Sequence, residues 1–157
     1  MHLVLPIKDF DINGIFFLDK TKNNILNGGD FYRLLYSTKN VTLNGIFLLI
    51  NLKITKHEDY FNKIKCYLHD TKNSECIEML KQIETVLLSD YVELNKFEND
   101  LQISQQLDLH TIKVINEYEN YKICDKTNEV NVILKISGIW TSGNKCGLTF
   151  RFFITHL

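Results

Sequence analysis

The sequence feature that most constrains the fold is a pair of alternating segments near the C-terminus. Residues 130–136 and 148–154 each carry apolar side chains at every second position, the spacing that puts them on one face of a β-strand. Between the segments lie Gly143 and Asn144, two residue types that tight turns favour. The pattern predicts a β-hairpin made of Val130–Trp140 and Gly147–Thr155.

Shorter strands are predicted upstream from the same alternation and from runs of β-branched and aromatic residues. In the clearest case, Asn62–His69, three apolar residues alternate with Lys and Tyr side chains. The predicted strands are Gly14–Leu18, Phe31–Ser37, Gly45–Ile54, Asn62–His69 and Thr111–Tyr118.

One helix is predicted at Ser74–Tyr91. Apolar residues such as Ile77 and Leu80 recur there at helical spacing. Residues 92–110 are polar and mixed, and a short helix near Asp100–Leu107 is left open.

The order of these elements predicts a β-rich α+β fold. The chain shows no internal repeat, linker or low-complexity tract, so residues 1–157 are expected to form one domain. A five-stranded OB-like Greek-key barrel with a helix between strands three and four has this order. Other small α+β folds are compatible with it as well.

Composition limits the functional classes. The formal net charge is −1, with 18 Lys/Arg against 19 Asp/Glu, which argues against a strongly basic nucleic-acid binder. The chain has no Ala, one Pro and two Arg, whereas Lys, Asn and Ile are abundant. This bias is typical of an AT-rich genome. Ten Phe, seven Tyr and one Trp provide large side chains for packing or for stacking.

The cysteines lack the spacing of a metal site, because no two form a CxxC pair. They are expected to be free thiols in a reducing compartment. The N-terminal segment is charged too early for a signal peptide, and the apolar run Ile46–Leu52 is too short to span a bilayer. An intracellular protein, cytoplasmic or nuclear, without a membrane partner is therefore predicted. The four cysteines are Cys66, Cys76, Cys124 and Cys146.

The sequence lacks the motifs of catalysis and cofactor binding. His57-Glu58 begins like the zinc-binding HExxH motif, but Phe61 stands where the second His is required. No GxSxG, P-loop or GxGxxG motif occurs. No catalytic residue, metal ligand or cofactor is predicted, and the protein is not expected to be an enzyme.

The C-terminal hairpin carries a family resemblance. Ile136–Trp140, a short polar turn and Gly147–Phe152 resemble the last hairpin of the OB-fold single-stranded DNA-binding proteins of large DNA viruses, which are similar in fold to the phage T7-type protein. The resemblance covers residues 130–154, and elsewhere the order of elements alone agrees. Phage-type proteins of this class end in an acidic tail. Residues 152–157 are not acidic, so recruitment of partners by such a tail is not expected.

An OB-fold implies a particular binding surface. The face of strands two and three, with the loops 1–2 and 4–5, binds the ligand. Cations contact the phosphates and aromatic rings stack on the bases. The residues at these places are Phe47, Lys53, Lys63, Lys65 and Tyr67 on the strands, Lys39 and Lys145 in the two loops, and Arg33, Arg151 and Phe153 on neighbouring strands. The alternative role of each Lys is to keep a strand edge soluble, and Trp140 is expected to pack rather than to stack.

Two functions from different classes follow. The first is a non-catalytic, sequence-tolerant single-stranded DNA-binding protein in viral DNA replication, repair or recombination, acting at a replication site in a host cell. DNA is preferred to RNA as the ligand, and a homo-oligomer is allowed. The alternative is a protein-interaction or assembly module that uses a β-sheet surface. Clustering of Lys63, Lys65 and Arg151 on one face favours the first, and a flat apolar patch favours the second.

Overall fold

The computed structural model describes residues 3–25, 28–90, 94–117, 122–123 and 128–155. Strands dominate this part of the chain, with two α-helices and two short 3-10 helices, η1 and η2. In chain order the elements are β1 (Leu5–Pro6), η1 (Ile7–Asp9), η2 (Ile12–Gly14), β2 (Ile15–Phe17), β3 (Thr21–Lys22), β4 (Asp30–Ser37), β5 (Thr42–Leu43), β6 (Ile46–Tyr60), β7 (Lys63–Leu68), α1 (Ser74–Ser89), β8 (Glu98–Asp100), α2 (Gln102–Asp108), β9 (Thr111–Ile115), β10 (Glu129–Ser142) and β11 (Lys145–Ile154).

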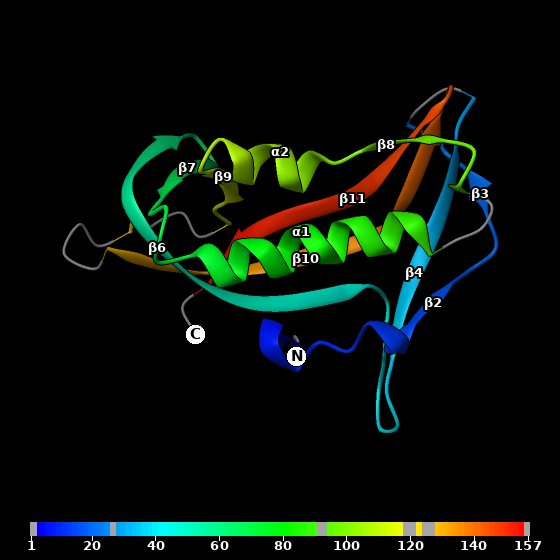
Figure 1. Ribbon diagram of the computed structural model, residues 1–157, viewed down its shortest axis with the longest axis horizontal. Helices are drawn as coiled ribbons and strands as arrows, with labels where there is room; N and C mark the ends of the chain where they lie inside the picture. The colour runs from blue at the N-terminus through cyan, green and yellow to red at the C-terminus, as the bar shows by residue number, and fades with distance from the viewer. Residues whose placement is uncertain (1–2, 26–27, 91–93, 118–121, 124–127, 156–157) are drawn as a thin grey trace.

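Five strands close into a barrel, in the order β6, β7, β9, β11, β10 and back to β6 (Figure 1). All neighbours in this ring are antiparallel except β9 and β11, which are parallel. The predicted β-rich, five-stranded barrel is confirmed. The predicted C-terminal hairpin is confirmed as β10 and β11, which are joined by the two-residue turn Gly143-Asn144.

The helices do not occupy the expected place. Both α1 and α2 lie between β7 and β9, the second and third barrel strands in chain order, so a helix between strands three and four is not confirmed. The helices follow a different barrel strand than predicted because β4, predicted as a strand of the same sheet, is not part of the ring. It pairs with the far end of β10, beyond a bulge at Ser137. Tyr91 and Tyr118, the predicted ends of the helix and of the following strand, lie outside the described residues.

β6 is the strand that bends the sheet into a ring. It pairs with β10 as far as Lys53 and with β7 from Ile54 onward. A bulge at Thr55 separates Ile54 from Lys56 in the pairing with β7. Bulges of this kind insert an extra residue and sharpen the twist. The even-numbered residues therefore face the core up to Ile54 and face outward afterwards.

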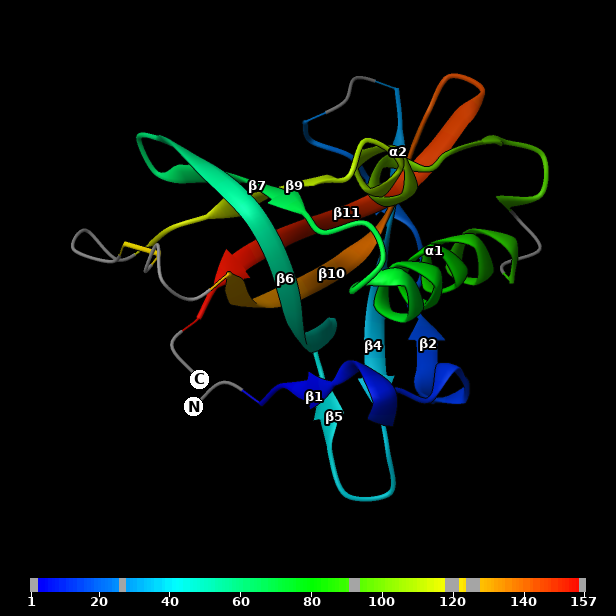
Figure 2. The same cartoon turned by 60° about the vertical axis from the view of Figure 1, so that its left-hand side comes forward.

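The core fills the barrel and the space under α1. The inward positions of the barrel strands are almost all Leu, Ile, Val, Cys or Phe. α1 adds Leu80, Ile83, Leu87 and Leu88, its buried apolar side chains, and crosses one side of the barrel (Figures 1 and 2). The thiols of Cys66, Cys76 and Cys146 are free, whereas Cys124 lies outside the described residues.

A buried carboxylate joins the two helices. Glu84 of α1 is fully buried. Its Oε1 accepts the backbone N–H of Ile103 at 2.9 Å, and its Oε2 accepts the N–H and the hydroxyl of Ser104 at 2.7 Å each. These donors belong to the first turn of α2, which would otherwise leave them unsatisfied. Glu84 thereby caps α2 from another helix and fixes its position beside the barrel.

Candidate nucleic-acid interface

Four cations lie side by side on the outer face of the barrel. Lys65 of β7 is directly opposite Lys113 of β9, and Arg151 of β11 is directly opposite Lys135 of β10. Val114 of β9 pairs with Phe152 of the parallel strand β11. Lys113 and Arg151 come one residue before them, so these two cations are neighbours as well. The residues on either side of each cation in its strand face the core. We call this line across four neighbouring strands, made of Lys65, Lys113, Arg151 and Lys135, the cationic row.

One carboxylate faces the cationic row, because Glu58 of β6 lies directly opposite Lys65 and interacts with it electrostatically. Among the described residues, none of its four members forms an ion pair, whereas Lys20, Lys53, Lys56 and Lys81 all do. Like charges directly opposite each other destabilise a sheet. The two like-charged pairs of the row are therefore expected to lower the stability of the sheet.

Aromatic rings flank both ends of the row. Phe47 of β6 is opposite Lys135, whose Nζ lies 5.5 Å from the ring centroid. At the other end, the Tyr67 ring has the Nζ atoms of Lys65 and Lys56 at 4.8 and 4.1 Å from its centroid. The row therefore has an aromatic ring at each end, with ammonium groups over the ring faces.

Glu58 organises the end of the row at β7. Its Oε2 accepts hydrogen bonds from the hydroxyls of Tyr60 at 2.8 Å and Tyr67 at 3.2 Å. These bonds, that of Tyr60 first, and the nearby lysines hold the pKa of Glu58 below its usual range. Hydrogen bonding to Tyr67 is the main cause that raises the pKa of Lys65. The bond to Glu58 holds the hydroxyl end of the Tyr67 ring in place.

The turn between β6 and β7 presents an unsupported aromatic side chain. Phe61 is fully exposed, at 109%, and its φ is 50°. This left-handed conformation is strained for a bulky residue. Tyr60 beside it is 54% exposed. Strain and exposed apolar surface at one position are features that cluster at binding sites.

The structure gathers some of the predicted binding residues and separates others. Six residues share the outer face of the closed ring in or beside the row: Phe47, Lys63, Lys65, Tyr67, Arg151 and Phe153. Four lie apart. Arg33 is on β4, opposite Gly138 of β10, and Lys39 is in the turn between β4 and β5. Lys53 is paired with Glu129, and Lys145 is at the β10–β11 turn.

One of these differences corrects the sequence-based assignment. The 1–2 loop of the barrel is the turn at Phe61 and Asn62, because β6 and β7 are the first two barrel strands. The segment with Lys39 lies outside the ring. Lys145 begins β11 at the turn between the fourth and fifth barrel strands, where the sequence places it, and lies six residues along β11 from Arg151, or about 20 Å in an extended strand.

Sequence reasoning missed Lys113 and Lys135. Both occupy outward positions of predicted strands, a signal that the alternation contains. Their relation to Lys65 and Arg151 depends on which strands are neighbours and in which register, and alternation within one strand carries no such information.

A groove lies next to the cationic row, between α2 and β11. Its volume is about 370 Å³. Lys63, Lys113 and Arg151 line one part of it, and Trp140 and Phe150 contribute aromatic walls. Gln102 and Gln106 of α2 also line it, and we call it the α2 groove.

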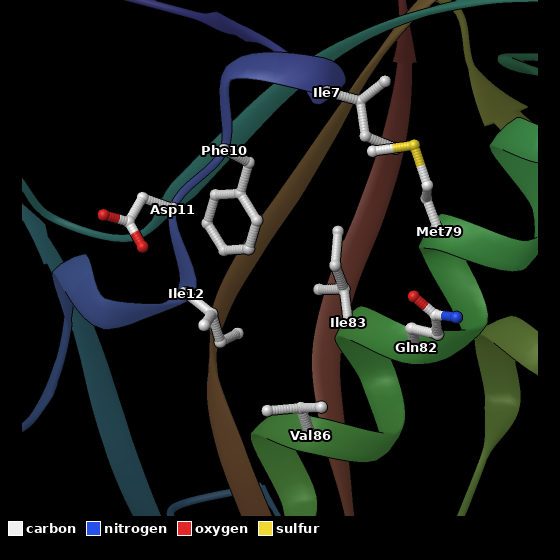
Figure 3. A pocket seen from close by; sticks show the side chains of 8 residues that line it. All are labelled: Ile7, Phe10, Asp11, Ile12, Met79, Gln82, Ile83 and Val86. Atoms are coloured by element: carbon white, nitrogen blue, oxygen red, sulfur yellow. The ribbon is translucent and has the colours of Figure 1, made fainter.

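A second groove, of about 330 Å³, lies between α1 and the N-terminal segment. Figure 3 shows Ile7, Phe10 and Ile12 on one side and Met79, Ile83 and Val86 of α1 on the other. Asp11 and Gln82 are its polar lining residues. It contains no cation, in contrast to the α2 groove, and so offers nothing to a phosphate.

In the portion of the chain covered by the structure, no three His, Cys, Asp or Glu residues are grouped so that they could hold a metal ion. None of the described helices combines the length and the hydropathy that crossing a membrane requires. In comparisons with known proteins, no family model, no curated protein and no solved structure matches the chain.

Proposed function

We propose that this chain is a non-catalytic, sequence-tolerant single-stranded DNA-binding protein built on an OB-like barrel. The observation that carries the proposal is the cationic row, in which four cations, none of them in an ion pair within the described part of the chain, adjoin one another on the outside of a closed barrel. A sheet tolerates such repulsion at a cost in stability, and binding of a polyanion removes it.

The strand order supports an OB-like assignment. β10, β6, β7 and β9 lie in the spatial order 4-1-2-3 that defines a Greek key, and β11 completes the ring. In an OB-fold, strands two and three and the 1–2 loop face the ligand. Here these are β7, β9 and the turn with Phe61, which is where the cationic row begins.

The dimensions of the row suit a short stretch of single strand. Three inter-strand steps of about 4.8 Å give a path of about 14 Å along the curved surface of the barrel. Such a span corresponds to a few nucleotides, near the lower end of the roughly 4–16 nucleotides that one OB-fold covers. Contact through phosphates and stacked rings is indifferent to sequence, since every nucleotide offers both groups.

The setting of this activity rests on the hairpin resemblance. It supports a role in viral DNA replication, repair or recombination, inside a host cell, with DNA preferred to RNA. A direct competition between DNA and RNA oligonucleotides of equal length tests the preference. Stronger binding of the DNA strand is the expected result.

Fluorescence anisotropy with a labelled single-stranded oligonucleotide tests the proposed function. The double variant Lys113→Gln/Arg151→Gln removes two charges from the row, and Lys20→Gln/Lys81→Gln removes two charges that are already paired with carboxylates. We expect the first variant to bind at least tenfold more weakly and the second to bind like the parent. Equal binding by both variants, or by duplex and single strand, would contradict the proposal.

The second candidate function is a protein-interaction module that uses the edge strand β2. Within the described residues, β4 is the one neighbour of β2. Phe16 in β2 and Leu18 just after it are 53% and 41% exposed. An open edge with apolar side chains can add a strand from another chain. If a second copy pairs there, sedimentation velocity will show a dimer that the variant Phe16→Lys abolishes.

A further inference from the structure

The α2 groove combines three kinds of group that a single nucleotide needs. Lys63, Lys113 and Arg151 bring positive charge, and none of the three forms an ion pair among the residues that the structure describes. Trp140 and Phe150 bring aromatic surface. A groove of about 370 Å³ falls in the size range of small-molecule sites.

Two glutamines of α2 supply the hydrogen-bonding groups. Gln102 and Gln106 are four residues apart and so share one face of the helix. The backbone N–H of Lys113 donates to Oε1 of Gln106 at 3.0 Å, which leaves the Nε2 donor of Gln106 available. The Nε2 of Gln102 donates to Oδ2 of Asp100 at 2.8 Å, which leaves its Oε1 acceptor available.

The orientation of both amides follows from the chemistry of their partners. A backbone N–H can only donate, and a carboxylate can only accept. Gln106 therefore offers a donor and Gln102 an acceptor on the face that lines the groove. The edges of nucleobases present donors and acceptors, so the two glutamines supply the kinds of group that a base edge can bond.

The walls of the groove are held in place. Glu84 fixes the first turn of α2, as described above. The Trp140 ring lies against Gly147, where a Cβ atom would come within 2.7 Å of the ring. A side chain at position 147 would push the ring away, so glycine there sets the position of the indole beside the groove.

We propose that the α2 groove is a subsite for one nucleotide of the bound strand. The base lies against Trp140, Gln102 and Gln106 hydrogen-bond its edge, and Lys113 and Arg151 hold its phosphate. This inference rests on the proposed function, because the same two cations belong to the cationic row. It adds that the protein binds one base directly, and not only the backbone.

Trp140 makes the inference testable without labels, because it is the single tryptophan of the chain. Its fluorescence is followed during titration of the unaltered protein with a single-stranded oligonucleotide and with a chain of abasic deoxyribose phosphates of equal length. We expect the oligonucleotide to quench the fluorescence and the abasic chain to leave it unchanged and to bind at least tenfold more weakly. Deoxynucleoside monophosphates should quench, whereas inorganic phosphate should not.

Variants of α2 provide the second test. Gln102→Leu/Gln106→Leu removes both base contacts and should weaken oligonucleotide binding about tenfold, since each hydrogen bond contributes a few-fold. Gln105→Leu is the matched control, because Gln105 also donates to Asp100 but does not line the groove.

The possible failures are distinguishable. If the oligonucleotide binds in anisotropy but leaves Trp140 unquenched, and the abasic chain binds equally well, the subsite is refuted and the proposed function stands. If no single strand binds at all, both proposals fall. The comparison of oligonucleotide with abasic chain uses the unaltered protein, so its outcome does not depend on whether a variant folds.

Discussion

Lys65 and Lys113 lie directly opposite each other on the antiparallel strands β7 and β9, with both side chains on the outer face of the barrel. Lys113 also neighbours Arg151 on β11. Repulsion within this group lowers the stability of the free protein. The same arrangement gives a single strand a continuous line of phosphate contacts. Removing one of these charges should therefore raise the stability of the protein and weaken its binding of a single strand.

Replacing Lys113 with Gln should raise the free energy of unfolding by about 0.2–1 kcal/mol, since it removes a repulsive cross-strand pair. Urea denaturation measures this change. Lys81→Gln makes the same change of charge at a lysine paired with Asp108 and should leave stability unchanged or lower it. A loss of stability in Lys113→Gln would show that Lys113 supports the sheet instead of straining it.

Replacing Glu84 with Gln should destabilise the fold by about 2–4 kcal/mol, because one amide oxygen cannot accept from all three donors that Glu84 now satisfies. Thermal or urea unfolding measures the loss. Glu78→Gln on the exposed side of α1 is the control and should have little effect. If both variants unfold at the same urea concentration, Glu84 is not the cap that fixes α2.

Stability should fall as the pH rises above about 9. Burial raises the pKa of Cys66 from 9.0 to about 12. Between these values the unfolded chain loses a proton that the folded chain keeps, so Cys66 alone lowers the free energy of unfolding by about 1.4 kcal/mol per pH unit.

The variant Cys66→Val isolates this contribution to the alkaline effect. Its free energy of unfolding should fall less steeply between pH 9 and 10.5 than that of the parent, while Cys76 and other groups contribute equally to both proteins. Parallel pH dependences would mean that the Cys66 thiol ionises in the folded state as readily as in the unfolded state.

Replacing Phe61 with Gly should separate stability from binding at the β6–β7 turn. Glycine adopts a φ of 50° without strain, so stability should rise by about 1 kcal/mol or stay constant. If the ring stacks on a base, binding of a single strand should weaken by about 1–3 kcal/mol. Phe16→Ala on β2 removes another exposed ring away from the row and should not change the affinity.

The sequence predicted the strands better than their arrangement. Strict alternation in residues 130–155 identified the C-terminal hairpin, and helical spacing identified α1, because both patterns are local. The bulge at Thr55 reverses the phase of β6, so the outward position of Lys56, Glu58 and Tyr60 was not predictable from alternation. For the same reason the alternation predicts a strand that ends at Ile54, whereas β6 continues to Tyr60.

The grouping of candidate binding residues was predictable only within a single strand. Lys63, Lys65 and Tyr67 share a face within β7, and their grouping was therefore visible in the sequence. Lys113 and Lys135 join them through the parallel β9–β11 contact and the closure of β10 on β6. These pairings join residues far apart in the chain, and the register that aligns them depends on the bulges.

The salt dependence of single-strand affinity tests the central claim most directly. Release of counterions from four phosphates predicts that log K falls with log salt with a slope of about −2.8, and that Lys113→Gln/Arg151→Gln reduces this slope to about −1.4. Anisotropy titrations between low and moderate salt measure both slopes. An affinity that does not change with salt, or the same slope in parent and variant, would contradict the assignment of the cationic row as the surface that binds DNA.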